Sequence, residues 1–477
     1  MKLEGLRTSL WLLIAASVST WYCSTAGGAS TADSGDSAGI GVTAAGSTVA
    51  TVGTGSVEQR SEGTTRGSGG ETVDSEDATA GSGGTTGDSG GESGGSGGTT
   101  GGSGGESGGS GGTTGGSGGI TADSGDASSG SAADFPFILG ADISSAQESN
   151  LSFQDTDGQT KTIFDLLKNH GFNYIRLRTF VDPMAPYGYA SSANGCSGRY
   201  EAFGDKNHVV AYGQRVKAAG MGFLLDFHYS DVWADPDKQI VPDAWRSASS
   251  ITDLATILKA YTKDVLTTAL DAGARPDMVQ VGNEITPGML MHVPGPNTDC
   301  WGNNPENAPI GGSTSSWDNL ATLLIAGIEG VREVDPTIRT VLHIENTEDL
   351  SGVKWWIDRA RSRGVEFDVL GLSCYTVWQE TPSVWENTFT DLAAIYPDLA
   401  FIIAEYNPER TRANLIMKNL PDGRGLGTFF WEPTLGGKWG SALFSRQGNT
   451  FVANSADFSE FDAMLPLLGL RGVLAEN

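Results

Sequence analysis

Short apolar runs recur at regular intervals along residues 134–477, and each is bounded by residues that favour turns. Runs of this length, rich in β-branched and aromatic side chains, are typical of buried strands. Eight runs fit the description: "FILGADIS" (137–144), "NYIRLRTF" (173–180), "GFLLDFHYS" (222–230), "DMVQVGNEI" (277–285), "TVLHIEN" (340–346), "FDVLGLSCY" (367–375), "AFIIAEYN" (400–407) and "GLGTFFWEP" (425–433).

Helical patterns separate these runs, and several of them end on Gly, which is favoured just past a helix C-terminus. The clearest are "TKTIFDLLKNHG" (160–171), "HVVAYGQRVKAAGM" (208–221), "LATILKAYTKDVLTTALDAG" (254–273) and "WDNLATLLIAGIEGVREVD" (317–335). Eight strands alternating with helices predict an α/β fold of the (β/α)₈ TIM-barrel type. A doubly wound open sheet is the alternative, but no Gly-rich phosphate loop follows the first strand.

The first quarter of the chain lacks this pattern. An apolar run, Leu10 to Val18, follows Lys2 and Arg7, which predicts a signal peptide over residues 1–26 and a secreted protein. Residues 27–133 consist mostly of Gly, Ser, Thr, Ala and acidic residues, with a 14-residue unit repeated from position 81. Such a segment cannot bury enough apolar surface to fold, so we expect a disordered linker before a catalytic domain at 134–477.

The net charge and the positions of the four cysteines limit which ligands and anchors the protein can have. The formal net charge of −27 argues against binding to nucleic acid or to anionic membrane surfaces, and the run at the N-terminus is too short to span a membrane well. Cys23 could carry a lipid anchor instead, although bulky residues precede it. Cys374 lies in an apolar run and is expected in the core, whereas Cys196 and Cys300 could pair in an oxidising compartment.

Polar and charged residues accumulate where the predicted strands end, which is where TIM barrels carry their active sites. Glu284 ends the fourth strand and Glu405 the seventh, so the two would face each other across the barrel mouth. Two such carboxylates are the equipment of a glycoside hydrolase: one protonates the leaving oxygen and the other attacks the anomeric carbon. Salt bridges at the strand ends are the alternative interpretation.

Several blocks of sequence resemble one family of enzymes. They are "FILGADISSAQES", "NYIRLR", "VDP", "AAGMGFLLDFHYSDVWADPDKQIVPDAW", "VQVGNEITPGML", "FDVLGLS" and "GKWGSALF". Together they resemble glycoside hydrolase family 53, the arabinogalactan endo-β-1,4-galactanases, from about Phe135 to Leu470. The resemblance implies hydrolysis of β-1,4-galactan, as found in pectic side chains, with retention at the anomeric carbon. It implies no cofactor and no metal in catalysis, and we expect a monomer.

The resemblance also implies roles for individual residues. Glu284 in "GNE" matches the acid/base and Glu405 in "AEY" the nucleophile. Asn283 matches the partner of the sugar 2-hydroxyl, and Arg176 matches the residue that keeps the nucleophile ionised. The residues expected to form the walls of the sugar-binding cleft are His228, Trp233, Tyr375 and Trp431.

Some features remain open. Asp142 is a candidate partner for the axial 4-hydroxyl of galactose, or else a structural residue at the rim. Met291 and His292 stand where the family pattern suggests Trp-Pro, Cys374 replaces a second Tyr, and the segment 407–424 is short, which leaves the outer subsites and a calcium site in that loop undecided. The alternatives in function are a mannanase or endoglucanase of the same clan, or a barrel that binds carbohydrate without cleaving it.

Overall fold

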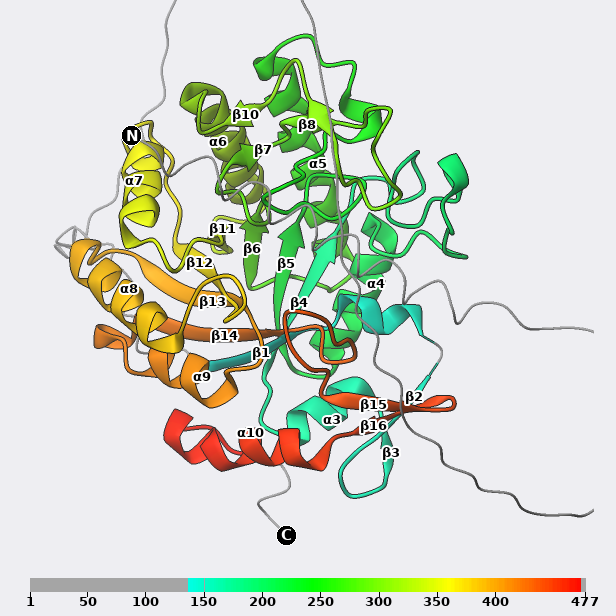
Figure 1. The fold of residues 1–477 in the computed structure, drawn as a ribbon, viewed down its shortest axis with the longest axis vertical. Helices are drawn as coiled ribbons and strands as arrows, with labels where there is room; N and C mark the ends of the chain where they lie inside the picture. Colours follow the sequence, from blue (N-terminus) through cyan, green and yellow to red (C-terminus); the bar gives the residue numbers. More distant parts are fainter. Residues whose placement is uncertain (1–135, 150, 473–477) are drawn as a thin grey trace, which may run out of the picture. The chain divides into compact units, whose positions relative to one another are not determined.

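The structure, a computed structural model, describes residues 136–149 and 151–472. The predicted signal peptide, the predicted linker and Cys23 lie outside these residues. Eight parallel strands close into a barrel whose neighbours follow the order β1-β14-β13-β12-β11-β6-β5-β4 (Figure 1). The strands are β1 (Ile138–Asp142), β4 (Tyr174–Thr179), β5 (Gly222–Phe227), β6 (Met278–Val281), β11 (Arg339–Ile344), β12 (Val369–Cys374), β13 (Ala400–Tyr406) and β14 (Gly425–Trp431). The predicted (β/α)₈ fold is therefore confirmed.

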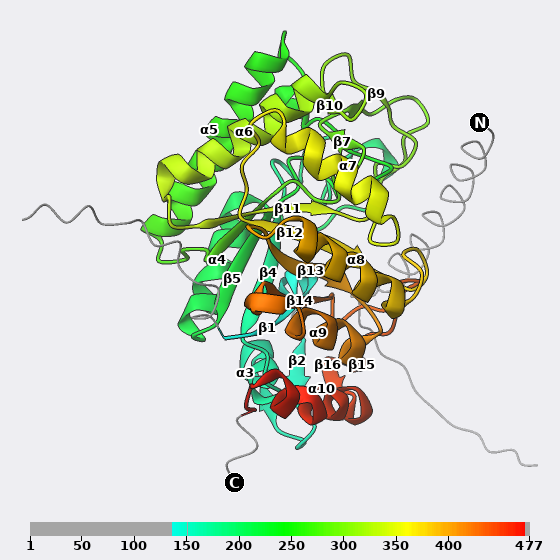
Figure 2. The ribbon, with the colours of Figure 1, turned by 90° about the vertical axis from the view of Figure 1, so that its left-hand side faces the viewer.

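One helix follows each barrel strand, and Figure 2 shows several of them packed around the barrel. They are α3 (Ile163–Asn169), α4 (Lys206–Ala218), α5 (Ile251–Asp271), α6 (Trp317–Val334), α7 (Leu350–Arg361), α8 (Pro382–Ile395), α9 (Arg410–Lys418) and α10 (Ser455–Leu468). Gly171 and Gly273 follow α3 and α5 with φ of +81° and +74°. The predicted glycine C-termini thus use a left-handed conformation that other residues adopt only at a cost.

Local chemistry sets the start of several helices. Thr162, Asp205 and Ser250 each accept a hydrogen bond from the backbone amide three residues further on, which caps α3, α4 and α5. The helical pattern predicted from residue 160 therefore begins only at Ile163. Residues 160–161 form a short strand instead, β3 (Thr160–Lys161).

The core has two layers. Side chains inside the barrel form one small cluster, and a larger one fills the space between the strands and the surrounding helices. The interior cluster contains Ile138, Leu224, Met278, Val341, Val369, Ile402, Ala404, Leu426 and Phe429. Most lie toward the N-terminal ends of their strands. The apolar packing in that half leaves the C-terminal half of the interior to polar side chains.

Three small sheets lie outside the barrel in the described part of the chain. Four strands, β15 (Phe444–Gln447), β16 (Thr450–Ala453), β2 (Ser152–Gln154) and β3, form a sheet in that order. Helix α10 lies along it in both ribbon views, and Phe458 of α10 packs edge-on against Phe444, with ring centroids 5.4 Å apart. Two pairs lie in the connection after β6: β7 (Gly288–Met289) with β10 (Gly312–Ser313), and β8 (His292–Val293) with β9 (Glu306–Asn307).

A disulfide joins two of the long connections at the C-terminal ends of the strands. Cys196, after β4, bonds to Cys300, after β6, across 104 residues of sequence. Cys374 is free and fully buried in β12, as the apolar run around it predicts. No helix among residues 136–149 and 151–472 has the length and apolar content that crossing a membrane requires.

Candidate active site

A buried arginine organises the C-terminal end of the barrel. Arg176, in β4, is completely inaccessible to solvent. Its guanidinium forms hydrogen bonds with side chains that lie in, or just after, four other barrel strands. Its partners are Glu405 Oε1 (2.9 Å), Asp142 Oδ2 (3.1 Å), Asp226 Oδ2 (2.9 Å), Asn283 Oδ1 (2.7 Å) and Gln280 Oε1 (3.2 Å). Burial would lower the pKa of Arg176, but the surrounding carboxylates outweigh it and raise the pKa. The cation therefore stays charged where it holds the site together.

Glu405 lies in β13 between two fixed donors. Its Oε1 accepts from Arg176 and its Oε2 accepts from the hydroxyl of Tyr375 at 2.9 Å. Burial raises the pKa of Glu405 to about 7, and Arg176 and Tyr375 both oppose that rise. The arginine therefore acts on Glu405 in the direction expected from the sequence, although burial has the larger effect. Both carboxylate oxygens are held in one orientation.

Glu284 has a different environment, because it comes three residues after the end of β6 and not within a strand. Its backbone has φ of +46°, a left-handed conformation that costs a non-glycine residue on the order of 1–3 kcal/mol and is found mainly at functional sites. Its Oε1 accepts a hydrogen bond from Ser373 Oγ at 2.7 Å. Burial raises the pKa of Glu284 well above its usual range, and the negative charges of Glu405 and Glu345 add to that effect.

A chain of hydrogen bonds connects Glu284 to Asn283 through a buried histidine. His343 Nε2 lies 3.0 Å from Ser373 Oγ, and His343 Nδ1 lies 2.9 Å from Asn283 Oδ1. Burial, then the nearby Arg176, lowers the pKa of His343 well below its usual value. The imidazole is therefore neutral and carries one proton, which lies on Nδ1 when it bonds the oxygen of Asn283 because that oxygen can only accept.

Asn283 is fixed in one orientation. Its oxygen accepts from Arg176, and its Nδ2 donates to the carbonyl of Ala234 at 2.9 Å. Gln280 Nε2, which donates to Asp226 Oδ1 at 2.6 Å, supports the same side of the cluster. An amide with its oxygen and nitrogen assigned by such partners cannot flip without loss of several bonds.

The residues expected to form the cleft walls differ in accessibility. Tyr375 and His228 are buried, whereas Trp233 and Trp431 are partly exposed. His228 Nδ1 accepts from the amide of Ala234 at 2.9 Å, which leaves its proton on Nε2. That nitrogen lies 3.1 Å from Asp226 Oδ2 but without hydrogen-bond geometry. His228 thus carries a buried donor that has no hydrogen-bonding acceptor among the described residues.

Asp142 lies below the surface of the site and has no exposed area. Its Oδ2 accepts from Arg176, and its Oδ1 accepts from both the amide and the hydroxyl of Ser144, at 3.0 and 2.7 Å. These contacts occupy the carboxylate within the protein. They fit the structural role that the sequence left open beside sugar binding.

A second buried arginine, Arg178, stands next to the first. It bonds Glu432 Oε1 at 2.6 Å and Ser145 Oγ at 2.9 Å. Its guanidinium lies over the rings of Trp233 and Trp431, with the carbon 5.3 and 6.0 Å from the ring centroids. This arrangement places the two tryptophans on a common cation, which is a favourable contact for both rings.

Sequence reasoning identified most of this cluster from the charged residues at the strand ends. It missed Gln280 and Ser373, which are uncharged residues within the apolar strands β6 and β12. The available signal was a polar side chain at an inward-facing position of a barrel strand. Among the described residues, no group of three or more His, Cys, Asp or Glu is arranged to hold a metal ion.

Comparison with known proteins gives a consistent result. The model of glycosyl hydrolase family 53 matches residues 138–415. An arabinogalactan endo-β-1,4-galactanase of Thermothelomyces thermophilus is 28% identical over 330 residues, which cover 62% of this chain and 88% of that enzyme. Arabinogalactan endo-β-1,4-galactanase A of Aspergillus niger is 31% identical over 279 residues, covering 56% of this chain and 69% of that enzyme.

Solved structures agree with the sequence relatives. One from a study of two fungal β-1,4-galactanases superposes with a TM-score of 0.54 at 27% identity, covering 68% of this chain and 98% of that one. The similarity therefore extends over nearly the whole of the fungal structure.

Proposed function

The chain belongs to glycosyl hydrolase family 53, and from this premise we propose that it cleaves internal β-1,4-galactosidic bonds of (arabino)galactan with retention of anomeric configuration. The observation that carries the proposal is the Arg176 cluster, which holds Asn283, the neighbour of Glu284, and Glu405 on one guanidinium. Retaining glycosidases use two carboxyl groups flanking the scissile bond, and this cluster fixes one of them directly and the other through its neighbour.

In the first step Glu405 attacks the anomeric carbon of the galactose unit and forms a covalent ester. The bond from that carbon to the glycosidic oxygen breaks, and Glu284 transfers its proton to the departing oxygen. The surroundings suit each task. Tyr375 and Arg176 orient the attacking carboxylate, while burial and nearby negative charge keep Glu284 protonated.

In the second step Glu284 removes a proton from water, and the water oxygen attacks the anomeric carbon and releases Glu405. The electrostatics favour this change of role. The charge of Glu405 is one of the factors that raise the pKa of Glu284, and that charge disappears when Glu405 becomes an ester. The pKa of Glu284 therefore falls when it must act as a base.

Substrate contacts follow from the side chains gathered around Glu284 and Glu405. Trp431 and Trp233 offer aromatic faces to the apolar side of a pyranose, as expected for sugar binding. Asn283 Nδ2 has a second hydrogen beyond the one donated to Ala234 and would donate it to the 2-hydroxyl. His228 Nε2 would donate to a sugar oxygen, because it has no other acceptor in the described part of the chain.

We also propose that the enzyme is monomeric and secreted, with a signal peptide over residues 1–26 and a flexible linker over residues 27–133. The composition of these segments supports the signal peptide and the linker. Pectic galactan outside the cell would then be the substrate. Mass determination of the protein recovered from culture medium would locate the cleavage site, and retention in the membrane fraction would favour the lipid anchor at Cys23.

The test of the activity is release of reducing ends from β-1,4-galactan, β-mannan and carboxymethylcellulose in parallel. We expect hydrolysis of galactan, with the β-anomer as the first product seen by NMR. Hydrolysis of mannan or cellulose instead would identify a different specificity, and an initial α-anomer would exclude the retaining mechanism. Binding to galactan without any cleavage would indicate a non-catalytic barrel.

A further inference from the structure

A second tryptophan pair extends from the active site onto the connection after β6. Trp301, next to the disulfide-bonded Cys300, packs on Trp233 with ring centroids 5.4 Å apart and an interplanar angle of 33°. Both rings are partly exposed. Trp301 comes from a long irregular segment, so its position depends on how that segment is held.

Four contacts fix the segment around Trp301. Cys300 is tied to Cys196, and the amide of Trp301 donates to Asp299 Oδ1 at 2.8 Å. Gly302 has φ of +78° and packs so closely that a Cβ there would lie 2.8 Å from Ile240 Cδ1. The side chain of Asn303 accepts from buried Lys238 at 3.0 Å. The ring is thus held in place before any ligand arrives, which lowers the entropic cost of binding.

The underside of this pair is equally well supported. Tyr189 packs edge-on against Trp233 at 4.4 Å and 89°, and Arg178 lies over the same ring at 5.3 Å. Trp233 is therefore supported on its inner side. Trp301 covers part of it and presents further aromatic surface.

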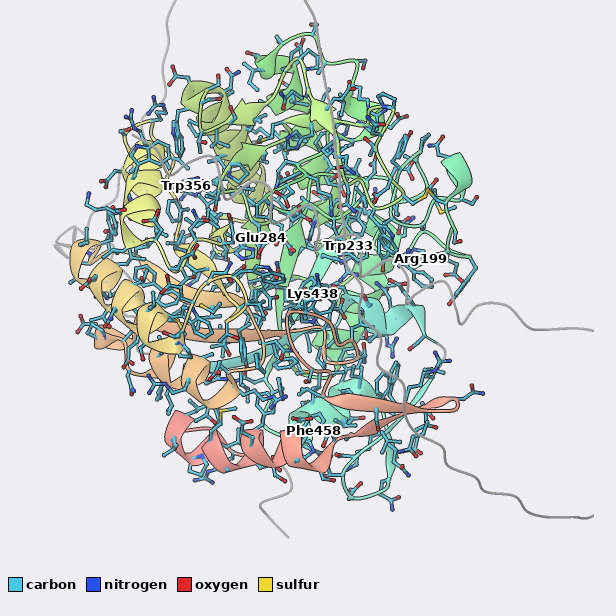
Figure 3. All side chains as sticks on the ribbon, in the orientation of Figure 1. Arg199, Trp233, Glu284, Trp356, Lys438 and Phe458 are labelled. Carbon is cyan, nitrogen blue, oxygen red and sulfur yellow. A yellow bond between two sulfur atoms is a disulfide. The ribbon has the colours of Figure 1, made fainter. Side chains whose placement is uncertain are left out.

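The pair is continuous with the catalytic cluster. Trp301 contacts Trp233, and Trp233 and Trp431 share the guanidinium of Arg178. Trp431 in turn lies 5.8 Å from Arg176, which bonds the carboxylate of Glu405. Figure 3 labels Trp233 and Glu284, and Trp233 lies between Glu284 and Arg199 in that projection.

We propose that Trp301 is the platform of an outer subsite, which binds a galactose ring of the polysaccharide at a distance from the bond that is cleaved. The Cys196–Cys300 disulfide positions this platform. The inference rests on the proposed galactanase function. The ligand is a neutral pyranose, because aromatic faces take up the apolar side of such a ring and the contact needs no charge.

A series of β-1,4-galacto-oligosaccharides of two to six units, together with polymeric galactan, separates this role from a purely structural one. We expect Trp301→Ala to leave kcat/KM unchanged for the shortest oligosaccharide that is cleaved. For the hexamer and the polymer it should fall about tenfold, mainly through KM, the loss expected for one stacking contact. Trp301→Phe should restore part of the loss.

Two further variants complete the experiment. Cys196→Ser/Cys300→Ser should give a smaller loss with the same dependence on chain length, because the contacts of Gly302 with Ile240 and of Asn303 with Lys238 still hold the segment. Trp355→Ala is the matched control, since Trp355 is 44% exposed on the outer helix α7 and should change no substrate's kcat/KM.

The outcomes are distinct. Equal losses on short and long substrates would assign Trp301 a structural role, and full activity of Trp301→Ala on the polymer would mean that no sugar binds there. Either result overturns the subsite while the galactanase function stands. A wild-type protein that releases no reducing ends from galactan overturns the proposed function, and the galactan subsite with it.

Discussion

Glu405 and Glu284 are the same chemical group in two different settings. Glu405 belongs to a regular strand, and both of its oxygens accept from fixed donors, Arg176 and Tyr375. Glu284 lies after the end of a strand, and its own backbone is left-handed. It accepts a hydrogen bond from the neutral hydroxyl of Ser373. Burial raises the pKa of each, but only Glu405 has a cation to oppose it.

This difference shows how one site can hold a charged and an uncharged carboxyl group at the same pH. The barrel supplies the burial, and the neighbours of each group decide how far its pKa rises. The two groups interact, so the acid and basic limbs of a pH profile belong to the pair. Each of the following changes tests one side of the comparison.

The largest effect should come from Glu405. We expect Glu405→Gln to lower kcat on every galactan or galactoside by on the order of 10⁶-fold, the loss typical of removing a nucleophile. The glutamine keeps the size of the side chain, so the melting temperature should stay near that of the wild type. The measurement is steady-state kinetics on galactan and on an aryl galactoside with a good leaving group. Far slower cleavage of both substrates than by the wild type would support the assignment. Retention of activity on the aryl substrate would contradict it.

Glu284 should be less critical when the leaving group needs no proton. We expect Glu284→Ala to lose about 10³-fold on galactan, within the range for loss of general acid catalysis, and far less in the first step on an activated aryl galactoside. Azide should then speed turnover and yield the β-galactosyl azide, because the covalent intermediate still forms. An α-azide, or equal losses on both substrates, would show that the two roles are reversed or wrong.

The sequence predicted well the barrel strands that carry Glu284 and Glu405. The eight apolar runs became the eight barrel strands within a few residues, because burial on both faces imposes an unmistakable pattern. Asn283 and Glu284 could be placed at a strand end for the same reason. That the strand stops at Val281 and Glu284 turns to positive φ was not predictable, since no glycine marks that position.

Residues that act through other residues were harder to predict. Ser373 and Gln280 look like ordinary polar residues of a strand, and only the closed barrel brings them to Glu284 and Arg176. The Cys196–Cys300 bond also requires two connections that are distant in sequence to meet. The sequence could therefore suggest this pair but could not show that the two sulfur atoms lie close together. Periodicity reports which face is buried, whereas contacts across the barrel depend on its closure.

A change at Tyr375 tests the hydrogen bond that its hydroxyl donates to Glu405. A hydrogen bond to a charged group contributes about 1.5–3 kcal/mol, so Tyr375→Phe should lower kcat/KM about 10- to 100-fold. Its hydroxyl lowers the pKa of Glu405, so its removal raises that pKa. Glu405 must be ionised to attack, and the acid limb of the kcat/KM profile should therefore move to higher pH. Tyr396→Phe, which changes a tyrosine whose hydroxyl bonds Asp358 outside the site, is the control. An acid limb at the wild-type pH would mean that Tyr375 does not tune the nucleophile.

The smallest effect should come from Ser373, on the other side of the comparison. When Glu284 is ionised, the Ser373 hydroxyl donates to it and accepts from His343 Nε2, so His343 Nδ1 then has no proton to donate to Asn283. When Glu284 is protonated, it can donate to Ser373, whose hydroxyl donates to His343 Nε2, and His343 Nδ1 donates to the oxygen of Asn283. The serine thus serves both states but favours the ionised one, and it lowers the pKa of Glu284.

Ser373→Ala should accordingly raise the pKa of Glu284 and move the basic limb of kcat/KM to higher pH, with only about a two- to tenfold loss at the optimum, since the bond lost is to a neutral donor. The matched control is Ser459→Ala, which removes an exposed hydroxyl that bonds a backbone carbonyl in α10. The acid limb should move less than the basic limb, because Ser373 does not contact Glu405 and affects it only through the coupling with Glu284. If the basic limb instead moved to lower pH, or if the acid limb moved as far as the basic limb, the hydroxyl would not act on Glu284 in the way the two environments require.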